Sequence, residues 1–186
     1  MIIQAENDEG DLAEMRDGIL KGIELGEKWD SKNLLICTED SRTSEEFTST
    51  LEGLIKLHKP DLVIIDPLLA YVGGNVLEQE VMSKFLRNQL NPILHEHLCG
   101  CIIIHHTNKP SKEKSDGSAS DSAYAGSGSA ELANWPRGVI CLYSTKNHGL
   151  FELILAKRGN RVGWKGKNGE KVYSKGHLRK TYSNFR

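Results

Sequence analysis

The fold class of this chain is indicated most clearly by one stretch of its sequence, Asp61-Leu62-Val63-Ile64-Ile65-Asp66-Pro67. Its four consecutive apolar residues leave no polar face, which is typical of a strand that is buried on both sides within a parallel sheet. Pro67 lacks an N–H group and therefore stops the strand. The stretch predicts a central parallel strand that delivers the carboxylate of Asp66 at its C-terminal end, where open α/β sheets bind their ligands.

Strand-like and helix-like segments alternate on both sides of this stretch. Because the strands are apolar on both faces, the alternation predicts an α/β fold, in which helices flank a mostly parallel sheet. Pro92 should kink or break the last of the helices. The expected strands are residues 1–5, 33–37, 62–65 and 99–104, and the expected helices are residues 12–25, 44–57 and 77–97.

The C-terminal part of the chain has a different character. Residues 108–129 are rich in Ser, Gly, Lys and Asp, a composition that cannot pack a core and predicts a mobile loop. A short helix over residues 129–134 and strands over 138–143 and 151–157 should follow. The pair Asn168-Gly169 predicts a β-hairpin turn between Trp164 and Tyr173.

Length and composition indicate an ordinary globular protein. The chain has 186 residues, of which 38% are hydrophobic and 26% charged, which suits a single domain. It contains no apolar run of about 18 residues and no signal-peptide pattern, so we expect a cytoplasmic protein. The four cysteines lie in apolar segments without a framework of spaced pairs, which predicts reduced thiols.

The net charge of −1 hides a strong asymmetry. Residues 157–186 hold ten Lys or Arg and one acidic residue, whereas residues 1–156 hold fourteen basic and twenty-four acidic residues. A basic end beside an acidic body suggests contact with a polyanion such as nucleic acid. A solvated charged tail is the alternative interpretation.

Carboxylates at strand ends are the first candidates for chemistry. Asp66 could hold Mg²⁺ through water, because this ion keeps much of its hydration and takes few protein carboxylates; capping of the next turn is the alternative. Glu6 ends another strand and is the best candidate to orient or deprotonate an attacking water. Glu39 is the second candidate, and a solvated loop acid is the alternative for both.

Histidines and basic residues supply further candidates. His105 and His106 follow the strand over residues 99–104, at the same sheet edge as Asp66, where they could sense a γ-phosphate. A zinc site built from the His and Cys residues between 95 and 106 is disfavoured, because their spacing matches no common ligand pattern. Arg137 could reach a nucleotide on a neighbouring subunit, and Lys157 could contact phosphate. An ordinary surface cation is the alternative for both.

In their order along the chain, these motifs resemble the RepA-like hexameric replicative helicases and their AAA-type, RecA-like relatives. The resemblance covers residues 1–162 and implies a truncated RecA-like ATPase core, which leaves residues 163–186 as a basic C-terminal hairpin or tail. The motifs are Gln4-Ala5-Glu6-Asn7-Asp8 followed by Arg16, Asp66-Pro67, His105-His106-Thr107-Asn108-Lys109, Gly126-Ser127-Gly128 with Arg137, and Lys157-Arg158-Gly159-Asn160.

The resemblance also implies roles for these residues. The intact protein would use ATP and Mg²⁺, bind single-stranded DNA and form a homo-oligomeric ring such as a hexamer. By that likeness, Glu6 would be the catalytic carboxylate and Asp66 the magnesium-linked Walker B residue. His106, with His105 beside it, would be the γ-phosphate sensor. Arg137 would be an arginine finger given in trans, and Arg16 and Lys157 would be supporting site residues.

The sequence departs from this family at the phosphate-binding loop. The family carries G-x-x-x-x-G-K-[ST] before the strand of Glu6, and no such motif occurs in the 186 residues. Without the backbone N–H groups and the lysine of this loop, the β- and γ-phosphates lose their main ligands. We therefore expect a fragment of a helicase core that is inactive alone. The missing strand would lie beside residues 99–104, whose apolar edge should be open.

Two other interpretations stay open. The chain could be a degenerate RecA-like module that binds a partner or DNA without hydrolysing ATP. A small metal-dependent phosphoesterase that uses Asp66, His105 and His106 is less favoured, because a second cluster of acids is lacking.

Overall fold

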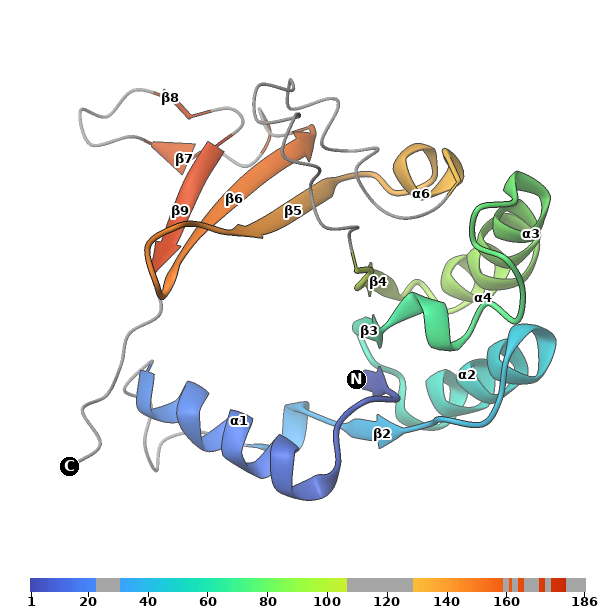
Figure 1. Cartoon of the computed structure of the whole chain (residues 1–186). Coiled ribbons are helices and arrows are strands. Elements are labelled where there is room, and N and C mark those ends of the chain that lie inside the picture. Colours follow the sequence, from blue (N-terminus) through green and yellow to red (C-terminus); the bar gives the residue numbers. More distant parts are fainter. Residues whose placement is uncertain are drawn as a thin grey trace. The chain divides into compact units, whose positions relative to one another are not determined.

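A computed structural model describes residues 1–22, 31–106, 129–158, 161, 164–165, 171–172 and 175–179. The chain divides into two compact units, residues 1–106 and residues 107–186 (Figure 1). The first unit contains a parallel sheet with helices, and the second contains antiparallel strands.

The sheet of the first unit is parallel throughout and has the strand order β2-β1-β3-β4. In the register of the sheet, Gln4 pairs with Asp66 on one side and with Thr38 on the other, so these three strands end level with one another. The predicted parallel sheet is confirmed, and the residues after the strands reach one edge. The strands are β1 (Ile2–Gln4), β2 (Ile36–Thr38), β3 (Leu62–Asp66) and β4 (Gly100–Ile103).

One face of this sheet is covered by α2 (Ser44–His58) and by a helical rod over residues 79–96 (Figure 1). The rod consists of α3 (Gln79–Ser83), the π-helical η4 (Lys84–Leu90) and α4 (Asn91–Glu96).

The rod changes from π- to α-helix just before Pro92, where the sequence predicts a kink or break. The N–H of Asn91 bonds to the carbonyl oxygen of Leu86, five residues earlier. Pro92 has no N–H to donate, and its ring would crowd the carbonyl four residues before it in an α-helix. The wider π turn leaves room for the proline ring at this position, so the helical rod continues through Pro92.

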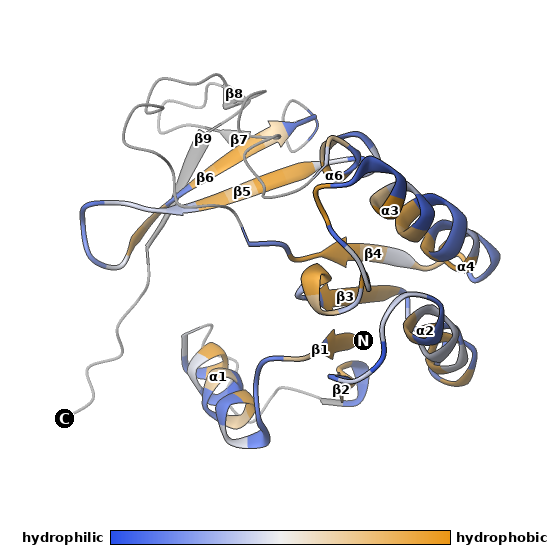
Figure 2. Ribbon diagram, turned by 45° about the vertical axis from the view of Figure 1, so that its right-hand side comes forward, coloured by the Kyte–Doolittle hydropathy of each residue, from blue (hydrophilic) through white to orange (hydrophobic). Residues whose placement is uncertain are grey.

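The core of the first unit lies between the helices and the covered face of the sheet. Ile3, Val63 and Ile65 point from the strands into this layer and are at most 1% exposed. Their inward positions alternate with outward ones, as the two-residue period of a strand requires. Figure 2 shows the apolar colour along the strands and mostly hydrophilic outer surfaces on α3 and α4. The helical residues buried most deeply are Phe47, Leu51, Ile55, Met82, Phe85, Leu86 and Leu90.

The opposite face of the sheet is also apolar but stays accessible within the first unit. Leu62 is 40% exposed, Ile102 48% and Ile104 38%. β4 is the last strand of this sheet among the described residues, and β3 is its neighbour on one side. The sequence predicted strands that are apolar on both faces, and the structure shows one of these faces covered and the other open.

Helix α1 (Glu9–Gly22) follows β1 through a short turn. A carboxylate oxygen of Asp8 accepts the N–H of Asp11 at 2.9 Å, so Asp8 caps the first turn. This cap explains why the helix begins at Glu9, three residues before the predicted Leu12. The last three residues of the predicted helix, 23–25, lie outside the described part of the chain.

Two short 3-10 helices, η2 (Ser31–Asn33) and η3 (Leu68–Ala70), complete the first unit. The 3-10 turn of η2 takes residues 31–33, so β2 starts at Ile36 and not at the predicted Asn33.

The second unit is antiparallel. β5 (Val139–Ser144), β6 (Leu150–Lys157) and β9 (Lys175–Arg179) form a sheet in that order, after the short helix α6 (Glu131–Asn134). The pairing of β9 with β6 ties part of the basic segment 163–186 to the strand that ends at Lys157.

β7 (Trp164–Lys165) pairs with β8 (Lys171–Val172), as the hairpin predicted around Asn168-Gly169 requires. The turn itself, and most of the predicted loop 108–129, lie outside the described residues.

Among the residues that the structure places, no helix is both long and apolar enough to cross a membrane.

Candidate functional site

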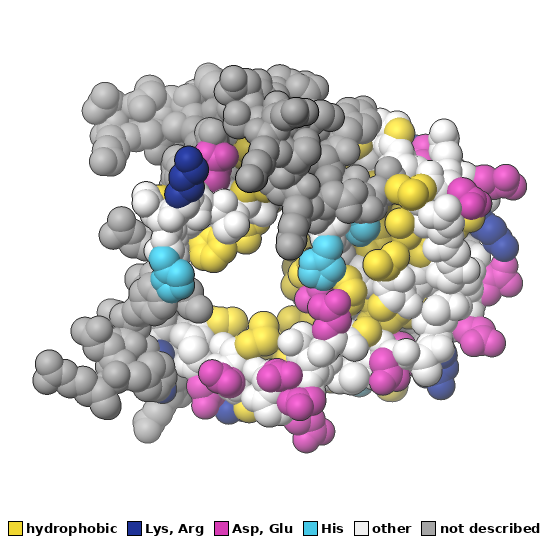
Figure 3. All heavy atoms as spheres, in the orientation of Figure 1, with side chains coloured by type: hydrophobic (Ala, Val, Ile, Leu, Met, Phe, Trp, Pro, Cys, Tyr) yellow, Lys and Arg dark blue, Asp and Glu magenta, His cyan; other side chains and the backbone are white. Residues whose placement is uncertain are grey.

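Glu6, Asp66 and His106 come together at the carboxyl edge of the parallel sheet. Asp66 is the last residue of β3, while Glu6 and His106 lie two and three residues beyond the ends of β1 and β4. The Nε2 atom of His106 lies 3.6 Å from the Oε1 atom of Glu6. Figure 3 shows histidine and carboxylate side chains adjoining on the surface of the molecule. The structure therefore joins three of the predicted site residues.

Electrostatics at this edge favour a cation. Burial raises the pKa of Asp66, the negative charge of Glu6 raises it further, and His106 acts in the opposite direction. A carboxylate whose ionisation is disfavoured in this way gains from a divalent ion beside it. Carboxylate oxygens and water are the ligands that Mg²⁺ prefers, so the pair of Asp66 and Glu6 fits a hydrated Mg²⁺ ion.

Glu6 has the access that chemistry on a bound ligand needs. Its side chain is 54% exposed and that of His106 is 67% exposed. A carboxylate that water can reach, with an imidazole within 4 Å, can orient a water molecule or accept its proton. His105, one position before His106, is half-buried.

Gln4 positions the loop that carries Glu6. Its side chain is 1% exposed, and its Oε1 atom accepts the backbone N–H groups of Glu6 at 3.0 Å and Asn7 at 2.7 Å. Its Nε2 atom donates to the carbonyl of Asn7 at 2.8 Å and to Oγ1 of Thr38 at 2.9 Å. This role of Gln4 was not predicted from the sequence, although a lone polar residue in an apolar strand is a usable signal.

Glu39, the second candidate for the catalytic carboxylate, uses both of its side-chain oxygens for contacts within its own loop. It is 8% exposed, and its Oε1 atom accepts the N–H of Ser41 at 3.0 Å, the hydroxyl of Ser41 at 2.8 Å and the N–H of Arg42 at 3.0 Å. Its Oε2 atom pairs with the guanidinium of Arg42.

These contacts decide the ionisation of Glu39. Burial disfavours the ionised carboxylate and by itself would raise the pKa. The hydrogen bonds from Ser41 and Arg42 outweigh this effect and lower the pKa of Glu39 to about 2. So weak a base, with both oxygens engaged, is poorly suited to take a proton from water. The geometry favours Glu6 over Glu39.

The remaining predicted site residues come from other elements of the two units. Arg16 is on α1, where its guanidinium pairs with Asp17 at 2.9 Å. Arg137 is exposed at the start of the segment leading into β5. The ammonium of Lys157 donates to three backbone carbonyls, those of Ala133, Asn134 and Pro136, at 2.8 to 2.9 Å.

The contact of Lys157 has a structural consequence. A cation against the last carbonyls of α6 satisfies acceptors that the helix leaves open. It also fixes the turn that precedes Arg137. The roles of Arg16, Arg137 and Lys157 at a nucleotide stay predictions.

Burial disfavours the thiolate form of two of the cysteines. It raises the pKa of Cys101 to about 12 and also raises the pKa of Cys99. Zinc binds the thiolate, so an ion at either sulfur would have to displace a proton that burial holds more tightly.

Comparison with known proteins supports the fold. The sequence matches no family model and no curated protein. Among solved structures, the chain is similar to the RadB recombinase, with a TM-score of 0.57 over 96% of this chain and 74% of that one, at 14% sequence identity. The fold is therefore RecA-like, a parallel sheet flanked by helices with a C-terminal antiparallel hairpin.

Proposed function

We propose that this chain is the RecA-like motor core of a replicative DNA helicase of the plasmid and phage type, and that it hydrolyses ATP when a phosphate-binding loop is supplied. The observation that carries the proposal is the convergence of Glu6, Asp66 and His106 at the carboxyl ends of three parallel strands. RecA-like sheets place their ligands at this edge.

Each of the three residues has a role that suits phosphoryl transfer. Asp66 holds a hydrated Mg²⁺ ion, which neutralises charge on the phosphates of ATP. Glu6 orients the attacking water and accepts its proton. His106 donates a hydrogen bond to the γ-phosphate and so couples its presence to β4. Gln4 keeps Glu6 in place through the two backbone N–H groups that it accepts.

In this proposal the phosphate-binding loop is supplied by residues that are not among these 186. The sequence contains no G-x-x-x-x-G-K-[ST] motif. At the sheet, β4 is the last strand that the structure describes, and Leu62, Ile102 and Ile104 form an accessible apolar face next to this edge. A further parallel strand with its loop and helix would pair with β4 and cover these side chains.

The second unit supplies the groups for assembly and for DNA. In this proposal residues 1–162 form the ATPase core, and the basic segment 163–186 contacts single-stranded DNA. Copies of the protein form a ring, in which Arg137 reaches the nucleotide of its neighbour and stabilises developing charge on the phosphate. Lys157 supports Arg137 by holding the preceding turn. We place the protein in the cytoplasm.

The test is Mg²⁺-dependent ATP hydrolysis, with and without single-stranded DNA. It compares this chain, a form extended upstream through the Gly-rich loop, and the extended form with Glu6→Gln. Turnover by the extended form alone, abolished by Glu6→Gln, supports the proposal. If neither form hydrolyses ATP while the chain still binds single-stranded DNA or a protein partner, the function is that of a degenerate RecA-like binding module.

A further inference from the structure

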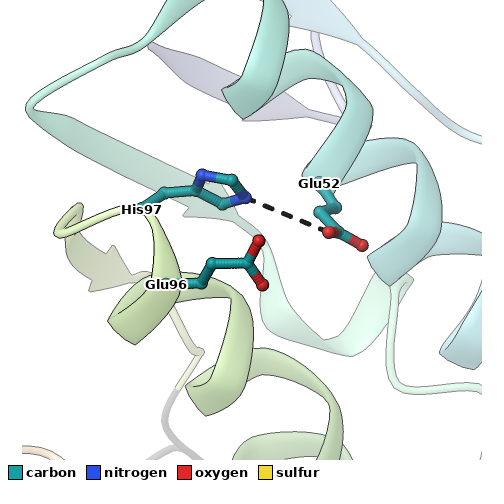
Figure 4. Close-up of side chains that lie close together, drawn as sticks. All are labelled: Glu52, Glu96 and His97. Carbon is teal, nitrogen blue, oxygen red and sulfur yellow. Dashed lines mark ion pairs between the residues drawn. The ribbon is translucent and has the colours of Figure 1, made fainter.

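A second cluster of ionisable side chains lies in the helical layer, away from the residues that end the strands. Glu52 comes from the middle of α2, while Glu96 and His97 come from the end of α4 (Figure 4). One ligand atom of each residue lies within 4.8 Å of the others. The two carboxylates and the imidazole point toward one another across the gap between the helices.

The Nε2 atom of the His97 imidazole lacks a hydrogen-bond partner among the described residues. This atom is buried, although the side chain as a whole is 18% exposed. The Oε1 atom of Glu52 lies 3.9 Å from this nitrogen, which is too far for a hydrogen bond. Buried polar atoms without a partner are uncommon and call for an explanation, such as an ion.

We propose that Glu52, Glu96 and His97 bind a divalent transition-metal ion of the Zn²⁺ class. One imidazole and two carboxylates form a ligand set that suits Zn²⁺, whereas Mg²⁺ prefers oxygen ligands alone. Three protein ligands leave a fourth position for water. The ion would join α2 to α4 and so fasten together the two helical segments that cover one face of the sheet.

The movement that metal binding requires is small. Ligand atoms around a tetrahedral Zn²⁺ ion lie about 3.3 Å apart, given bond lengths of about 2.0 Å. The present separation of up to 4.8 Å closes through rotation of the Glu96 side chain, which is exposed, and of Glu52, which is 31% exposed. The backbone and the half-buried ring of His97 need not move.

Lys56 competes with the ion for the same carboxylate. Its Nζ atom lies 2.5 Å from the Oε1 atom of Glu52, one helical turn away on α2. A bound divalent ion must displace this ammonium from that oxygen and also experiences its repulsion. Removal of the positive charge should therefore strengthen metal binding.

The experiment is a calorimetric titration of the intact chain with Zn²⁺, repeated for four single variants. His97→Ala and Glu96→Gln should each weaken binding at least about tenfold, the usual effect of damage to a metal site. Lys56→Gln should tighten binding. The matched control is His95→Ala, because His95 is an exposed imidazole one residue before Glu96 on α4 and should leave the affinity unchanged.

Each other outcome overturns the proposal. No binding by the wild-type chain would show that the site does not exist. Unchanged affinity in His97→Ala, or an equal loss in His95→Ala, would place the ion elsewhere. Equal binding of Mg²⁺ would show that the site is not of the Zn²⁺ class. Glu96 is exposed, so Glu96→Gln should keep the fold; its circular dichroism spectrum checks this. That variant keeps the test valid even if His97→Ala unfolds the protein.

Discussion

The loops after β1 and β2 start from neighbouring strands, and each carries a glutamate, yet the two side chains have opposite environments. Glu6 in the first loop is 54% exposed and has an imidazole at 3.6 Å. Glu39 in the second loop is 8% exposed, and its two oxygens accept hydrogen bonds from Ser41 and Arg42.

The different environments of Glu6 and Glu39 show that the role of an acid is not determined by its position at a strand end. Glu39, whose carboxylate is fully hydrogen-bonded and has a pKa of about 2, stabilises its loop and cannot serve as a base. A carboxylate that water reaches, beside the half-buried Asp66 and the imidazole of His106, is available for chemistry.

The largest expected effect is on turnover. In the form extended through the phosphate-binding loop, Glu6→Gln should lower kcat for ATP hydrolysis by about 10²- to 10⁴-fold, because it removes the base that acts on water. Glu39→Gln is the matched change in the neighbouring loop and should leave kcat within a few-fold. Steady-state hydrolysis assays measure both. The opposite pattern, with Glu39→Gln as the inactive variant, would refute the assignment.

The second effect is on stability. Glu39→Gln should lower the free energy of unfolding by about 2 kcal/mol, because it weakens charge-assisted hydrogen bonds to a buried group. Urea denaturation of the chain measures this loss. Glu46→Gln, an exposed acid on α2, is the control and should stay within about 0.5 kcal/mol of the wild type. Equal stability of Glu39→Gln and Glu46→Gln would show that the Glu39 contacts contribute little.

The third effect is the pH dependence of that stability. Glu39 has a folded-state pKa of about 2, below the ordinary 4.5, so its contribution is present above pH 4.5 and is lost as the pH falls toward 2. The difference in unfolding free energy between wild type and Glu39→Gln should therefore shrink from about 2 kcal/mol at pH 7 toward zero near pH 2. A difference that stays constant over this range would contradict the hydrogen-bonded, ionised state of Glu39.

The smallest effect concerns Asp66. Its folded-state pKa is raised, so the ionised side chain costs stability at neutral pH and this cost disappears once the group is protonated in both states. Asp66→Asn should therefore stabilise the chain at pH 7 by up to about 1 kcal/mol. Thermal unfolding at pH 7 and pH 3 measures this effect. Destabilisation at pH 7 would show that Asp66 has a structural role.

The sequence predicted most of the first unit, because the signals there are local. An apolar run ended by Pro67 defines β3, and parallel strands have to end at one edge, so the meeting of Glu6, Asp66 and His106 follows from topology. β9 was not predicted, because its five residues Lys175–Arg179 contain a single large apolar side chain. Only its pairing with β6 makes that segment a strand.

Side-chain partners were harder to predict than strand ends. Whether Glu6 or Glu39 is available depends on which hydrogen bonds each loop closes, and those depend on turn geometry within three residues. The approach of Glu52 to His97 joins two residues that are 45 positions apart in the chain, and no spacing rule predicts it. The role of Gln4 was visible only as an exception to the apolar pattern of its strand.

The most direct test of the account is to locate the bound nucleotide on the extended form of the protein. Nuclear magnetic resonance with a non-hydrolysable ATP analogue and Mg²⁺ reports which residues it perturbs. The account predicts large chemical-shift changes at Glu6, Asp66 and His106, which disappear in Asp66→Ala, with small changes at Glu39. Saturating nucleotide that leaves those three residues unchanged would contradict a phosphoryl-transfer site at this edge of the sheet.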